Sequence, residues 1–118
     1  MAVYFATNDP SALRDAFNQA IANHHRAGGI DTWRHVVHEG KHFYTHTSAQ
    51  YKDKAWFRAA LEANRLAFHI RPFQGVSLTR DTYAYYAGHL IETFIRHFPK
   101  MFTITQATPS AAGDDAPF

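Results

Sequence analysis

The chain has 118 residues, of which 46% are hydrophobic, and a formal net charge of +2 at pH 7. This length predicts one domain with enough apolar residues for a core. The absence of cysteine excludes disulfides and thiolate metal sites, and it fits a reducing compartment. The first ten residues lack the regions of a signal peptide, and no segment approaches the ~20 apolar residues of a membrane helix. We therefore expect a cytoplasmic protein without a membrane partner.

Positive charge is concentrated in the middle of the chain. Residues 32–72 hold seven Lys or Arg residues against three Asp or Glu residues, a net charge of +4, and five of the nine histidines. Residues 107–118 are instead small and acidic and contain Pro and Gly, which predicts a disordered C-terminal tail. We expect a single folded domain over residues 1–106.

A strand and a helix are predicted first. Residues 2–7 alternate in the way typical of a strand. Residues 8–29 follow as a helix, because the Asn-Asp pair at 8–9 can cap its start, Pro10 suits its first turn and the Gly-Gly pair at 28–29 can end it.

Two hairpins and a second helix follow. The hairpins are expected over residues 32–47, with a turn at Glu39–Gly40, and over residues 55–73, with a turn at Ala63–Asn64. A broad apolar stripe predicts a helix over residues 79–102, and a last strand could follow it at "FTITQ". The order is β-α-β-β-β-β-α, with that possible last strand. It predicts an α+β fold of two layers, a mainly antiparallel sheet with two helices on one face.

The second hairpin divides by alternate positions into an apolar set and a polar set. The apolar set is Phe57, Ala59, Leu61, Leu66, Phe68 and Ile70. Burying each large side chain of this set stabilises the fold by roughly 1.5–3 kcal/mol. A shift of one residue would bury Arg58, His69 and Arg71 instead, at a cost of several kcal/mol for each unpaired charge. We therefore expect these three residues and Trp56 to point away from the helices. Arg58 would then be opposite His69, and Trp56 would be opposite Arg71.

The first hairpin allows two orientations. One face holds Trp33, His35, Val37, His42, Tyr44 and His46, and the other holds Arg34, Val36, His38, Lys41, Phe43 and Thr45. Burying the second set confines most of its polar groups to the strand ends, whereas burying the first places His35 in the middle of the core. This favours the second set inward, although which face is buried stays open.

The exposed face of the sheet would then be rich in aromatic and basic side chains. Its candidate binding residues are Trp33, His35, Tyr44, His46, Trp56, Arg58, His69 and Arg71. Because a monomer seldom leaves such a surface bare, we predict a small non-catalytic binding or interaction module without a cofactor. Its partner would be another protein or a second copy of the chain. Single-stranded nucleic acid is an alternative, with bases stacking on Trp56 or Tyr44.

One sequence motif favours a different function. The segment "HEGKH" matches H-E-x-x-H, the pattern in which zinc hydrolases use two histidines as ligands and the glutamate as general base. Here these residues would be His38, Glu39 and His42. The Glu39–Gly40 pair favours a hairpin turn, which would send the two histidines to opposite faces. We therefore predict no metal site and no catalytic residue, and retain a zinc-dependent hydrolase as an alternative function.

Overall fold

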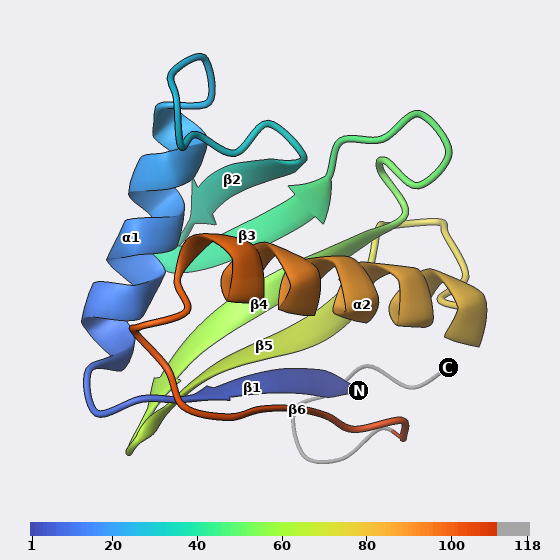
Figure 1. The fold of residues 1–118 in the computed structure, drawn as a ribbon. Helices are drawn as coiled ribbons and strands as arrows, with labels where there is room; N and C mark the ends of the chain where they lie inside the picture. The colour runs from blue at the N-terminus through green and yellow to red at the C-terminus, as the bar shows by residue number, and fades with distance from the viewer. Residues whose placement is uncertain (111–118) are drawn as a thin grey trace.

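The computed structural model describes residues 1–110, which form a six-stranded antiparallel sheet and two helices (Figure 1). The strands are β1 (Ala2–Ala6), β2 (Trp33–His38), β3 (Lys41–His46), β4 (Ala55–Glu62), β5 (Arg65–Pro72) and β6 (Thr105–Ala107), and the helices are α1 (Pro10–Ala22) and α2 (Arg80–His97). The strands lie in the order β2-β3-β4-β5-β1-β6. Both helices cover the same face of the sheet, so the predicted two-layer α+β fold is confirmed, including its last strand.

Both helices begin as expected but end earlier. The Asp9 carboxylate accepts a hydrogen bond from the Ala12 N–H (3.0 Å) at the start of α1, and the Thr79 hydroxyl accepts one from the Thr82 N–H (3.1 Å) at the start of α2. Helix α2 ends at His97 because the following Pro99 disfavours a helical conformation at the residue before it.

The Gly-Gly pair after α1 serves the turn that follows the helix. A Cβ atom on Gly29 would lie 2.1 Å from the carbonyl oxygen of Asn23, the residue that caps the end of α1. The chain therefore folds back closely on the helix end at Gly29, and α1 stops six residues before the Gly-Gly pair.

The core lies between the helices and the sheet and consists largely of aromatic rings. Phe5 of β1 stacks on Phe94 of α2 with their centroids 4.2 Å apart, and Phe68 of β5 packs edge-on against Phe17 of α1 at 6.1 Å. Phe57, Leu66, Phe68 and Ile70 supply the sheet side of this core, as their spacing predicts, and Ala59 packs against it. Leu61 is 45% exposed near the end of β4, so its predicted burial is wrong.

The two hairpins have the predicted turns and, in the second, the predicted register. Glu39 and Gly40 have φ values of 51° and 75°, which matches the two-residue type I′ turn. In the second hairpin Arg58 pairs with His69, and Trp56 pairs with Arg71.

The C-terminal part of the described chain closes the sheet beyond the expected limit of the domain. Ala107 belongs to β6, and the Thr108 N–H donates to the Ala2 carbonyl (2.9 Å). The Met1 ammonium group donates to the Ser110 carbonyl (2.6 Å). Residues 107–110 are thus part of the domain, and the rest of the expected tail, residues 111–118, lies outside the described residues.

Candidate functional site

In residues 1–110 both helices pack on one side of the sheet, which leaves the other side without a covering layer (Figure 1). We call this side the outer face. The side chains that define it are Tyr4, Arg34, Val36, His38, Phe43, Trp56, Arg58, His69 and Arg71, and they come from β1, β2, β3, β4 and β5.

Trp56 is the centre of an aromatic group on the outer face. Its indole stacks on the Phe73 ring with centroids 4.6 Å apart and an interplanar angle of 9°, and the Phe43 ring lies edge-on at 6.2 Å. The Arg34 guanidinium carbon lies 5.4 Å from the centroid of the indole, within the range of a cation–π contact. These neighbours hold the indole in one orientation, so its position is set before any partner arrives.

A hollow of about 310 Å³ opens beside this aromatic group. It is lined by Val36, His38, Phe43 and Trp56. Its volume lies at the lower end of the range of ligand pockets, and three of its four lining side chains are apolar. The hollow can therefore accept one apolar or aromatic side chain of a partner.

Two arginine side chains, Arg34 and Arg71, neighbour Trp56 on the outer face. Arg34 has a carboxylate neighbour, Asp53, at 3.6 Å, and both side chains are about half exposed. Arg71 is half-buried on β5, opposite Trp56. An exposed ion pair of this kind contributes little to stability, so Arg34 can exchange Asp53 for a carboxylate of a partner at small cost.

The structure brings together only half of the predicted site residues. Trp56, Arg58, His69 and Arg71 lie on the outer face, as expected. His69 is only 7% exposed there, with its Nε2 atom 3.8 Å from a Glu62 carboxylate oxygen. His69 is therefore a structural part of the face, and the side chains of Trp56, Arg58 and Arg71 are more exposed than that of His69.

The other four predicted residues point toward the helices, so the favoured orientation of the first hairpin is wrong. The Trp33 side chain is buried, and its Nε1–H donates to the Thr93 hydroxyl of α2 (3.1 Å). Tyr44 is fully buried, stacks on Phe17 of α1 at 4.7 Å and donates its hydroxyl proton to Asn18 Oδ1. Burial raises the pKa of Tyr44 well above its usual value, so this hydroxyl remains a donor.

His46 is also buried under the helices, and each of its two ring nitrogens makes a hydrogen bond. Its Nδ1 atom accepts from the Ser48 N–H (3.0 Å), which leaves the proton on Nε2 to be donated to His89 Nδ1 (3.0 Å). Burial, and then the proximity of His89, lower the pKa of His46 to about 4. Both ring nitrogens of His46 thus have hydrogen-bond partners within the protein, so His46 is not open to a ligand.

His35 and His42 form a second histidine pair, beside α1. His35 Nε2 and His42 Nδ1 share a hydrogen bond of 2.8 Å, and the Asn18 amide nitrogen lies 3.5 Å from the same His42 atom. Burial, and then nearby positive charge, lower the pKa of both imidazoles. The pair is thus neutral and hydrogen-bonded at pH 7, and this satisfies His35 in the position that the sequence argument treated as a cost.

The helix layer explains why the sequence argument chose the wrong face. The hairpin sequence indicates which polar groups would be buried, but not the partners that Asn18, His89 and Thr93 supply from distant parts of the chain. With those partners present, burying the large rings of Trp33 and Tyr44 stabilises more than burying Val36 and Phe43.

The observed orientation of the first hairpin places on the outer face several residues that the sequence analysis did not select. Arg34, Val36, His38 and Phe43 form its β2–β3 part, and Phe73 supports Trp56 from the loop after β5. A comparison of ring sizes between the two sets of the first hairpin would have pointed to them, because the larger set is the one that is buried.

The two histidines of the H-E-x-x-H motif lie on different faces of the first hairpin. His38 lines the hollow on the outer face, whereas His42 contacts His35 and Asn18 on the helix side. The two imidazoles therefore point to opposite faces of the hairpin. Among residues 1–110 there is also no group of three or more His, Asp or Glu side chains that could hold a metal ion.

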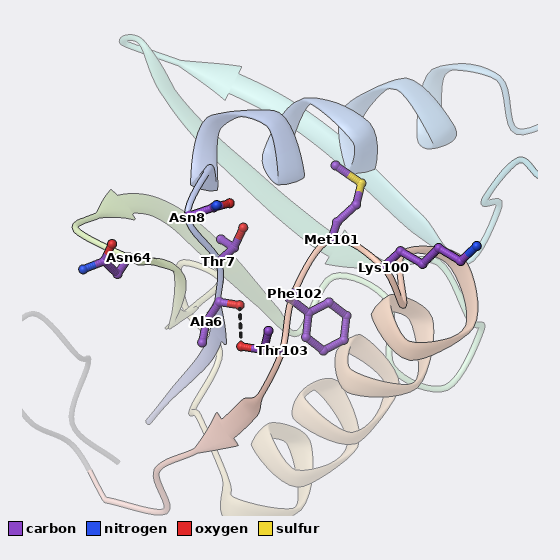
Figure 2. Close-up of a pocket in the computed structure, with 8 residues that line it drawn as sticks. All are labelled: Ala6, Thr7, Asn8, Asn64, Lys100, Met101, Phe102 and Thr103. Carbon is purple, nitrogen blue, oxygen red and sulfur yellow. Dashed lines mark hydrogen bonds between the residues drawn. The ribbon is translucent and has the colours of Figure 1, made fainter.

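A second hollow, of about 440 Å³, lies at one end of the sheet, where β1, α1, the β4–β5 turn and the end of α2 meet (Figure 2). Its Thr103 N–H donates to the Ala6 carbonyl (2.9 Å), and its Thr7 N–H donates to the Asn64 carbonyl (3.1 Å). Met101 and Phe102 pack against the core. Lys100 is its one charged lining side chain, so this hollow has no set of groups for a specific ligand.

Comparison of the chain with protein-family models, with curated proteins and with solved structures gives no match. Neither α1 nor α2, the helices of the described residues, combines the length and hydropathy needed to cross a membrane.

Proposed function

We propose that the protein is a non-catalytic binding module whose outer face holds an acidic segment of another protein. One apolar or aromatic side chain of that segment would occupy the hollow lined by Val36, Phe43 and Trp56. The observation that carries this proposal is the position of the hollow, next to Arg34 on a face that neither described helix covers.

The charge of the face supports an acidic partner. Arg34, Arg58 and Arg71 extend from β2 to β5 across the outer face, and the carboxylates of Asp53 and Glu62 lie at its border. A basic surface of this kind attracts acidic segments and increases the rate of encounter.

The aromatic contacts support a protein partner over single-stranded nucleic acid. Of the two rings expected to stack with bases, Tyr44 is buried under α1. Phe73 covers one face of the Trp56 ring, and the Arg34 guanidinium lies over the indole. Base stacking needs an open ring face, whereas occupation of the hollow that Val36 and Phe43 line does not.

The proposal can be tested with random 12-residue peptides displayed on phage and selected on the full chain. We expect enriched peptides to combine Asp or Glu with one Leu, Phe or Trp. Synthetic copies should bind about tenfold or more weakly to Trp56→Ala, because truncation of a central aromatic anchor costs most of the local binding energy. Binding should also weaken when the salt concentration rises to about 0.5 M.

The matched control is Ile95→Ala, which removes an apolar side chain that is 53% exposed on α2, in the other layer. It should leave peptide affinity unchanged. Peptides that bind wild type and Trp56→Ala equally would overturn the proposal. So would a failure of selection combined with tight binding of a single-stranded oligonucleotide such as dT12, which would assign the face to nucleic acid.

A further inference from the structure

Strand β2 is one edge of the sheet, and its outer edge has no partner strand in residues 1–110. The two-residue turn at Glu39–Gly40 makes His38 and Lys41 a hydrogen-bonded pair, and such pairs alternate along an antiparallel ladder. Residues 34, 36 and 38 therefore bond to β3. The N–H and C=O groups of Trp33, His35 and Val37 point away from the sheet.

This edge has few of the features that usually prevent pairing with another chain, and Arg34 is its one Lys or Arg residue. Strand β2 has six residues and contains no proline, no lysine and no positive-φ residue. Its two valines are exposed, Val36 by 37% and Val37 by 54%. The opposite edge, β6, has only three residues. A six-residue, partly apolar edge without proline is a typical site of strand addition.

The sequence of β2 is complementary to itself in one antiparallel register. With His35 opposite His35 of a second copy, Trp33 faces Val37 and Arg34 faces Val36, so no like charges are opposed. All three free N–H and C=O pairs of each copy are then used, because residues 33, 35 and 37 of one strand meet residues 37, 35 and 33 of the other. A shift that places Arg34 opposite Arg34 opposes two charges, and the reverse shift loses one bonded pair.

We propose that two copies of the chain join through β2 and form one continuous antiparallel sheet. The self-complementary register selects a second copy as the partner of this edge, and a two-fold symmetric contact is the commonest form of assembly. This inference concerns the edge of the sheet and does not depend on the proposed use of its outer face.

The first test is sedimentation of the full chain over a range of concentrations, with Val37→Pro and Val37→Thr as a matched pair. Proline removes one outward N–H without touching the β2–β3 ladder, whereas threonine keeps the N–H and the branched shape. We expect wild type and Val37→Thr to dimerise. We expect the dissociation constant of the Val37→Pro dimer to be about tenfold or more higher than that of wild type, because two hydrogen bonds are lost in each dimer. A wild-type monomer at about 200 μM, or a dimer that survives in a folded Val37→Pro, would overturn the inference.

A second test does not depend on the folding of the proline variant. Because the natural chain has no cysteine, a single introduced thiol can be followed without background. His35→Cys should form a disulfide-linked dimer on mild oxidation, since opposite residues of a bonded pair have Cα atoms about 5.5 Å apart. Val37→Cys should not, since its two copies would be about 13 Å apart along the strands. The reverse pattern, or no cross-link in either variant, would contradict the register.

Discussion

At the scale of single residues, the histidines under the helix layer carry the clearest chemistry. His46 is 2% exposed and accepts a backbone hydrogen bond at Nδ1, so protonation of its ring would break that bond or place a charge in the core. Burial, and then His89, lower the pKa of His46 to about 4, compared with about 6.5 in an unfolded chain.

This difference predicts a loss of stability in mild acid. Between about pH 6.5 and pH 4 the unfolded chain binds a proton at His46 that the folded chain does not, so the free energy of unfolding falls as the pH falls. The expected loss is on the order of 3 kcal/mol, and His35 and His42 add to it because burial lowers the pKa of both. Urea unfolding at several pH values measures it. His46→Gln should flatten the pH dependence, and an unchanged slope in that variant would refute the assignment.

At the scale of elements, the β2–β3 turn holds a residue that is poorly suited to its conformation. Glu39 has a φ of 51°, in the left-handed region, where a side chain with a Cβ atom is disfavoured and asparagine is the best tolerated after glycine. The turn geometry therefore depends on Gly40 and on the hydrogen bonds of the ladder behind it.

We expect Glu39→Asn to stabilise the protein by about 0.5–1 kcal/mol, because asparagine followed by glycine is the preferred type I′ pair. Gly40→Ala should have the opposite effect, of about 1 kcal/mol, since alanine is strained at a φ of 75°. Urea unfolding at pH 7 measures both changes. A destabilising Glu39→Asn would show that the carboxylate has a role which its exposed position does not indicate.

The two hairpins show what local sequence can and cannot predict. In β4–β5 one set of alternate residues is apolar and the other contains Arg58, His69 and Arg71, so the wrong register would cost many kcal/mol and the face is unambiguous. In β2–β3 both sets mix polar and aromatic groups. The choice there depends on partners such as Asn18 and His89, which the chain supplies from other elements. Alternation within the hairpin contains no information on those partners.

At the scale of the whole molecule, the two ends of the described chain hold each other in place. Strand β6 pairs with β1, and the Tyr83 hydroxyl lies within hydrogen-bond distance of the carbonyl oxygens of both Ala2 (3.1 Å) and Thr108 (2.7 Å). The composition predicts that the chain changes near residue 107 to a small, acidic segment. It does not predict these backbone contacts, which depend on the position of β1 at that side of the sheet.

Removal of residues 105–118 should therefore destabilise the protein and promote aggregation. It would expose β1, a five-residue strand, as a second long edge and would remove the bonds between Thr108 and Ala2. Thermal unfolding and light scattering measure both effects. A chain that ends at Ser110 is the control, because it keeps every contact described for β6, and equal behaviour of the two truncations would contradict the role assigned to that strand.

The two tryptophans lie in different layers, and this gives the protein two natural fluorescent reporters. Trp33 is enclosed between the sheet and α2, whereas Trp56 lies on the outer face beside Phe73 and Arg34. In a Trp33→Phe variant the emission comes from Trp56 alone and responds to what occupies the face. In a Trp56→Phe variant it comes from Trp33 and responds to loss of the core. Unfolding and occupancy can thus be followed separately, without an added dye.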